Sequence, residues 1–257
     1  MISTFANPLK FMNATRWVGP VLLGLAVITL GVGIYIGLFI APADYRQGDA
    51  ARIMFIHVPA AMMCMGVYSF MVSASISSLI WKHALADIAG KSAAPIGTVF
   101  TAICLITGSL WGKPIWDTWW EWDARLTSVL ILFFLYLGYM AIWSAFETQQ
   151  KAARAAAILC MVGAVNIPII KWSVEWWTTL HQKASIRLAD DWREKLSKPS
   201  EIIHSELPEP FLSPLLTVLV GYGLLFGALV IMNMRAEIYA RRAEVLIQRR
   251  YAEEDED

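Results

Sequence analysis

Two of the four histidines in this sequence lie where a metal could be ligated. His57 is near the start of a long apolar segment, two residues before Pro59, and His181 lies ten residues after Lys171 in a later connection. A neutral imidazole is a good axial ligand for iron, and two imidazoles from different segments can ligate one ion from opposite sides. A single histidine in an apolar segment is more often structural, so metal ligation is inferred from the two histidines together.

Tryptophans cluster beside both histidines in the sequence. Five lie within residues 111–122, and three more lie within 171–177, so the two clusters hold eight of the twelve tryptophans. Indole rings offer flat apolar faces while their N–H groups stay near water. An aromatic belt at the membrane surface would spread over both faces, so we expect a platform for a flat apolar ligand such as haem. The platform residues are Trp111, Trp116, Trp119, Trp120 and Trp122.

Three charged residues flank these clusters. Arg52 and Arg125 stand at the ends of apolar segments, where a guanidinium could form a bidentate contact with a haem propionate or anchor the chain to lipid phosphate. Both interpretations remain open. Asp123 directly precedes the apolar segment that begins near residue 126, so we expect its carboxylate to cap that helix.

Other chemistry finds little support in the sequence. Asp117 and Glu121 could form an acid and base pair, but no nucleophile or hydrolase motif accompanies them. His83 and His204 are interpreted as structural or solvated. The cysteines lie singly in apolar segments, which predicts neither a disulfide framework nor a zinc site; they are Cys64, Cys104 and Cys160.

The composition is that of an integral membrane protein. Hydrophobic residues make up 57% of the chain, charged residues 16%, and the mean hydropathy is +0.52. A net charge of zero offers no basic surface for nucleic acid. We expect an all-α, polytopic membrane protein that forms a single domain over residues 1–257, with an uncleaved first span. Its six predicted transmembrane helices cover residues 17–40, 54–81, 95–111, 126–146, 155–171 and 211–234.

The basic residues predict the orientation. Lysine and arginine numbers barely differ between the two sets of connections, but six of those in one set lie in the long loop 171–210, where the positive-inside rule is weak. The basic tail 235–257 adjoins a span directly. We therefore expect both termini in the cytoplasm, and the segments 41–53, 111–125 and 171–210 on the outer side. The tail is expected to be helical and frayed at its acidic end.

The run from Trp111 to Thr127 resembles the tryptophan-rich "WWD" signature of the haem-handling proteins of cytochrome c maturation. Within that group the chain is most similar to the CcmC family, haem exporter protein C. The similarity rests on six spans, one such motif, and the segment from Val174 to His181. It covers nearly the whole chain.

The resemblance implies a role and a set of residues. His57 and His181 would be the axial ligands of a non-covalently and transiently bound b-type haem, the segment Trp111–Asp123 its platform, and Arg52 and Arg125 the propionate partners. It implies a location in the bacterial inner membrane with a periplasmic haem site. The haem would pass to the haem chaperone CcmE, with CcmA and CcmB forming an ABC transporter and CcmD assisting assembly. Asp117 and Glu121 depart from the smaller or apolar residues expected there, which makes this platform more acidic.

Three other functions fit part of the pattern. A b-type cytochrome would use the same histidines to retain haem permanently, although its ligands usually lie within the spans. A haem lyase of the same group would be larger. A channel-type haem transporter would carry charged residues in its spans, and the central stretches of the predicted spans carry none. The sequence favours a haem-transfer component over a classical enzyme.

Overall fold

The computed structural model describes residues 7–181, 186–188, 203–205 and 207–254. This part of the chain is helical except for loops and one antiparallel pair of three-residue strands, β1 (Ile186–Leu188) and β2 (Ile203–Ser205). Six helical segments are long and apolar enough to cross a membrane. The predicted all-α, six-span architecture is thereby confirmed, with the two short strands lying in the connection between the fifth and sixth spans.

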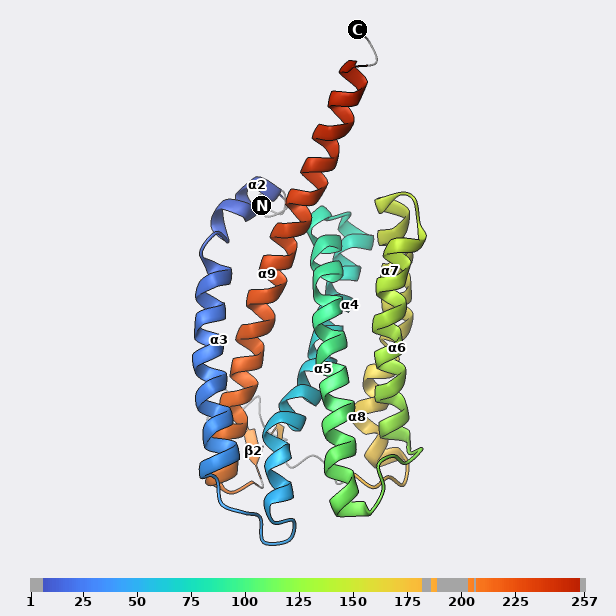
Figure 1. Ribbon diagram of the computed structural model, residues 1–257. Coiled ribbons are helices and arrows are strands. Elements are labelled where there is room, and N and C mark those ends of the chain that lie inside the picture. Colours follow the sequence, from blue (N-terminus) through green and yellow to red (C-terminus); the bar gives the residue numbers. More distant parts are fainter. Residues whose placement is uncertain (1–6, 182–185, 189–202, 206, 255–257) are drawn as a thin grey trace.

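The helices form one bundle (Figure 1). In it, α3 packs along α9, α4 packs on α5, and α6 contacts both α5 and α7. The helical elements are α2 (Pro8–Ala14), α3 (Val18–Tyr35), η1 (Ile36–Ile40), η2 (Asp49–Ile53), α4 (Met54–Trp81), α5 (Ala84–Trp116), α6 (Ala124–Ala145), α7 (Gln149–Gly163), α8 (Asn166–Trp176) and α9 (Glu209–Glu254).

The helices α5 and α9 extend furthest beyond the predicted spans. α5 begins eleven residues before the predicted 95–111, and the charge of Lys91 in this extra part is paired, since its Nζ lies 2.8 Å from Glu237 Oε1 of α9. At its other end α5 continues through Pro114, so that Trp111 and Trp116 belong to the helix. α9 continues to Glu254, which makes the described part of the tail helical, and it extends beyond the bundle (Figure 1).

The fifth span is broken between α7 and α8. Pro168 in the first turn of α8 lacks an N–H, and its ring would clash with the carbonyl of Ala164 in a continuous helix. The Ala164 carbonyl instead accepts a hydrogen bond from the Ile167 N–H at 3.1 Å. The chain therefore continues as a separate helix, α8, which extends five residues past the predicted end at residue 171.

Buried tyrosines join the middle helices. The rings of Tyr68 and Tyr136 meet edge to face at 5.2 Å, and Tyr136 donates a hydrogen bond to the Cys64 carbonyl at 2.7 Å. Gly97 of α5 faces the Tyr136 ring so closely that a Cβ would overlap it. These contacts fix α4, α5 and α6 relative to one another.

The chain ends and the predicted outer segments lie at opposite ends of the bundle. The N-terminal and C-terminal ends share one end, while the connections around residues 41–53 and 117–123 lie at the other (Figure 1). Six spans require this arrangement, so the tryptophan run and the start of the long loop share one face of the molecule.

Candidate haem site

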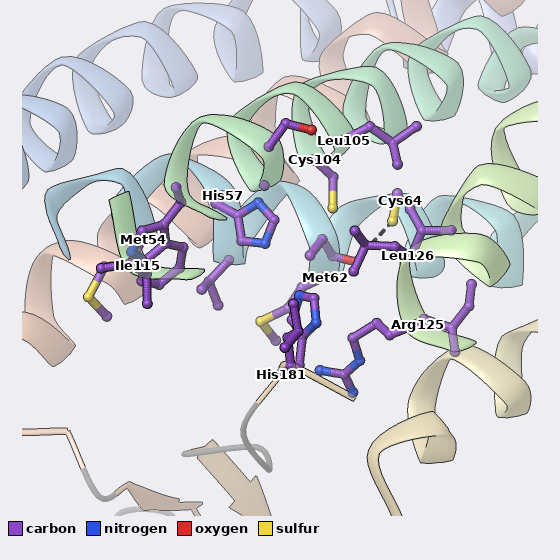
Figure 2. Close-up of a pocket in the computed structure, with 18 of the residues that line it drawn as sticks. Met54, His57, Met62, Cys64, Cys104, Leu105, Ile115, Arg125, Leu126 and His181 are labelled. Carbon is purple, nitrogen blue, oxygen red and sulfur yellow. Dashed lines mark hydrogen bonds between the residues drawn. The ribbon is translucent and has the colours of Figure 1, made fainter. Parts of the chain in front are cut away.

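A cavity of about 410 Å³ opens at the end of the bundle where α4 begins and α5 ends. Its volume lies within the range of small-molecule sites, and most of its lining is apolar or aromatic. Figure 2 shows His57 and His181 directed into it from different elements. The predicted site residues that line it are His57, His181, Trp111, Trp116, Trp120 and Arg125.

His57 is held against α5. Its Nδ1 lies 3.0 Å from Thr107 Oγ1, and its ring meets the edge of Trp111 at 5.7 Å between centroids. Gly108 provides the space for this approach, since a Cβ there would lie 3.0 Å from His57 Cε1. The ring is therefore fixed on one side by a single helix and faces the cavity on the other.

His181 is held less firmly, after the end of α8. Its Nδ1 is buried, has no hydrogen-bond partner among the described residues and lies 3.6 Å from Asp123 Oδ2, while its ring lies 5.2 Å from that of Trp116. Burial, assisted by Arg125, lowers the pKa of His181 below its ordinary value, and Asp123 opposes the shift. The imidazole is therefore neutral at pH 7, the form that ligates iron.

Asp123 is the N-cap of α6, as predicted. Its Oδ1 accepts a hydrogen bond from the Leu126 N–H at 2.7 Å, and its Oδ2 accepts one from the Leu180 N–H at 3.4 Å. The same carboxylate thus joins the start of α6 to the residue before His181. Asp123 itself does not line the cavity.

The tryptophan run divides between the cavity and the outer surface. Trp111 donates from Nε1 to Gln47 Oε1 at 2.9 Å, and the Trp120 Nε1 is buried with no partner in the described ranges. Trp119 and Trp122 are outside the lining, with 56% and 74% of their surface exposed. Trp111, Trp116 and Trp120 therefore line the cavity, while Trp119 and Trp122 lie on the outer surface beside it.

The two arginines differ in their surroundings. Arg125 lines the cavity (Figure 2), and its Nε donates to Ser173 Oγ at 3.3 Å. Arg52 is outside the lining; its guanidinium contacts Asp49 Oδ1 at 2.9 Å and donates to the Leu38 carbonyl at 2.7 Å. The structure brings only Arg125 to the cavity.

A family model described as Heme exporter protein C matches residues 1–249 of the chain. The chain belongs to the heme exporter protein C family. Similar members are the Heme exporter protein C of Bradyrhizobium diazoefficiens, 50% identical over 241 residues (94% of this chain and 86% of the relative), and that of Haemophilus influenzae, 47% identical over 240 residues (93% and 92%). That of Escherichia coli K12 is 45% identical over 230 residues (90% and 87%).

Membership of the heme exporter protein C family confirms the resemblance found in the sequence. Two cavity residues, Gln47 and Lys171, nevertheless went unpredicted, as did Thr107, which lies behind His57 and outside the lining. Nothing in the sequence around Thr107 indicates that its hydroxyl contacts His57. Cys64 and Cys104 are buried free thiols, as expected, but they also line the cavity.

Two further predictions concern residues away from this cavity. His83 precedes α5 at the opposite end of the bundle, where its Nδ1 is buried and no described residue is its hydrogen-bond partner. His204 lies in β2, and most of the long loop lies outside the described residues. Among the residues that are described, no group of three or more histidine, cysteine or acidic side chains could hold a metal ion.

Proposed function

We propose that this chain binds haem between His57 and His181 at the periplasmic face of the inner membrane and delivers it to the chaperone CcmE. One observation carries the proposal: two imidazoles from different elements face one aromatic cavity in a member of the heme exporter protein C family. The porphyrin supplies four of the iron ligands, so two histidines complete the coordination.

The residues of the cavity suit haem in three respects. The His181 Nδ1 is a buried polar atom to which the described part of the chain offers no hydrogen-bond partner, as expected where a ligand or its hydrogen bonds complete the site. Trp111, Trp116 and Trp120 supply apolar faces. Arg125 places a guanidinium at the same cavity, where a propionate can pair with it.

The remaining predicted residues would act at the rim. Arg52 would have to exchange its contacts with Asp49 and the Leu38 carbonyl before pairing with a propionate. Trp119 and Trp122 are exposed, and we assign them to the edge of the site that the chaperone approaches. Asp123 would act by holding the segment that carries His181.

Delivery requires a site that holds haem firmly and still releases it. Non-covalent binding through two imidazoles and stacked indoles meets this need, because no bond to carbon must break on release. Covalent capture of haem by the chaperone would pull the binding equilibrium forward. CcmA and CcmB, forming an ABC transporter, and the small protein CcmD are the other proposed partners.

A transfer assay tests the proposal. Purified haem-loaded protein in detergent is mixed with apo-CcmE, and the haem that each partner holds is measured after separation. We expect wild-type protein to lose haem to the chaperone, and His181→Ala to transfer little because it loads poorly. Retention of all haem by the wild type, with CcmE and its partner proteins present, would indicate a permanent b-type cytochrome instead.

A further inference from the structure

The contact between His57 and Thr107 determines which imidazole nitrogen carries the proton. Thr107 Oγ1 lies 2.6 Å from the Ile103 carbonyl oxygen and 3.0 Å from His57 Nδ1. A threonine hydroxyl has one proton to donate, and a carbonyl can only accept. The proton therefore goes to the Ile103 carbonyl, and the hydroxyl oxygen is left to accept from His57 Nδ1–H.

This arrangement leaves Nε2 of His57 as the basic nitrogen. A neutral imidazole has one N–H and one lone pair, so a proton on Nδ1 places the lone pair on Nε2. In metal sites the partner of the non-ligating nitrogen fixes both the tautomer and the ring orientation. Thr107 stands in that position relative to His57.

The same part of α5 also determines how closely the His57 ring approaches the helix. Gly108 has no side chain, which leaves space for His57 Cε1 against the helix, and Trp111, one turn further along, contacts the His57 ring edge to face. The His181 Nδ1 has no hydrogen bond of this kind among the described residues, and it lies 3.6 Å from Asp123 Oδ2. Of the two imidazoles, His57 is therefore the one for which the described residues show a hydrogen bond that selects a nitrogen.

We infer that Thr107 is a positioning residue that holds His57 as the Nδ1–H tautomer, so that Nε2 is presented to the iron. The inference rests on the proposed function for the identity of the ligand, but the tautomer itself is a property of the protein without haem. Two measurements therefore test it separately.

The first measurement uses the protein without haem. Histidine labelled with ¹⁵N is observed by NMR in detergent, and His57→Ala identifies the His57 signals. Wild-type protein should show Nδ1 protonated and Nε2 bare. Thr107→Val should lose this preference, and Thr107→Ser, which keeps the hydroxyl, should restore it. An unchanged tautomer in Thr107→Val would overturn the inference.

The control is Thr101→Val on the same helix. Thr101 is buried and donates to the Gly97 carbonyl at 2.7 Å, as Thr107 does to Ile103, but the contact with His57 Nδ1 belongs to Thr107. Its replacement removes the same kind of bond to the helix backbone. Thr101→Val should therefore leave the His57 signals unchanged, and a tautomer change there would mean that any lost threonine disturbs the site.

The second measurement is a haem titration followed by absorbance. Loss of a partner of a metal-ligating histidine typically lowers metal affinity about 10- to 100-fold, so we expect a loss in that range for Thr107→Val and near wild-type affinity for Thr107→Ser and Thr101→Val. Wild-type affinity in Thr107→Val would contradict the positioning role. Failure of the wild type to bind haem would contradict the proposed function, and the tautomer result would still stand.

Discussion

Asp123 links two features of the site through its two carboxylate oxygens. Oδ1 caps α6, and Oδ2 lies near the Leu180 N–H and the His181 ring. The cap contributes about 1 kcal/mol to helix stability. The second contact orders the residues that present His181, so the two contributions can be separated by substitution.

Asp123→Asn and Asp123→Ala make that separation. Asparagine caps a helix about as well as aspartate, so Asp123→Asn should unfold like the wild type but bind haem more weakly, because the charge near His181 is gone. Asp123→Ala should lose about 1 kcal/mol of stability and also bind weakly. Denaturant unfolding and haem titration measure the two effects. Wild-type haem affinity in Asp123→Asn would refute the role of this carboxylate at His181.

The pH dependence of binding should reflect His181. Burial and Arg125 keep the pKa of His181 below the ordinary 6.5. The imidazole is therefore more than half neutral at pH 6.5, and protons compete with iron for it as the pH falls further. Haem affinity measured by titration should fall with decreasing pH, and the His181 titration in the protein without haem should have its midpoint below pH 6.5. A midpoint at or above 6.5 would mean that the site does not lower this pKa.

Residue types predicted much of the cavity, but not all of it. His57, His181 and Arg125 reach it from three separate parts of the chain, as the pattern of histidines and tryptophans indicated. The outward direction of Trp119 and Trp122 depends on the turn after Asp117, which has a left-handed φ of 55°. Side-chain direction in such a turn has no periodicity that a sequence could display. Thr107 was missed because its partner lies fifty residues away.

At the scale of elements, the crossing of α5 and α6 supports the site. Gly97 leaves room for Tyr136, whose hydroxyl reaches the Cys64 carbonyl at the cavity wall. Gly97→Ala should overpack the contact between α5 and the Tyr136 ring and lower the free energy of unfolding by about 1–3 kcal/mol. It should also weaken haem binding, because α5 carries Thr107 and Trp111. Unfolding in mixed detergents and haem titration measure both effects.

Gly66→Ala is the matched control. Gly66 lies in α4, and a Cβ there would meet nothing within 4 Å. Alanine in a helix interior is favoured over glycine by about 0.5–1 kcal/mol, so this variant should be neutral or stabilised and should bind haem normally. Equal destabilisation by both substitutions would show that the crossing at Gly97 is not especially tight.

The ends of the helices were predicted unequally well from apolar length. The predicted bounds of α4 and α6 agree with the structure to within two residues. The predicted span was too short for α5, because its first part contains the charged residues Asp87 and Lys91, and the pairing of Lys91 with Glu237 of α9 is not visible in the sequence. Hydropathy could not place the break between α7 and α8 either. The effect of Pro168 on the Ala164 carbonyl is a local steric one.

At the scale of the whole molecule, the site and the two ends of the chain lie at opposite ends of the bundle (Figure 1). The proposed orientation puts the ends in the cytoplasm. Glu121 and Glu244 are exposed at the two opposite ends, while the native thiols are buried. Single cysteines at these positions therefore report the orientation against a low background.

A membrane-impermeant maleimide makes this measurement in cells with a permeable outer membrane. Glu121→Cys should be labelled from outside, and Glu244→Cys only after the inner membrane is opened, since the reagent cannot cross an intact bilayer. Unsubstituted protein measures labelling of the native cysteines. The reverse labelling pattern would contradict the orientation and place the cavity on the cytoplasmic side.

The central claim is that His57 and His181 together hold haem, and the visible spectrum tests it most directly. Purified wild-type protein should show a six-coordinate, low-spin haem spectrum in both oxidation states. His57→Ala and His181→Ala should each weaken the Soret band, and added imidazole should restore it by replacing the missing ligand. A wild-type spectrum in either variant would contradict the account, because the iron would then be held without that histidine.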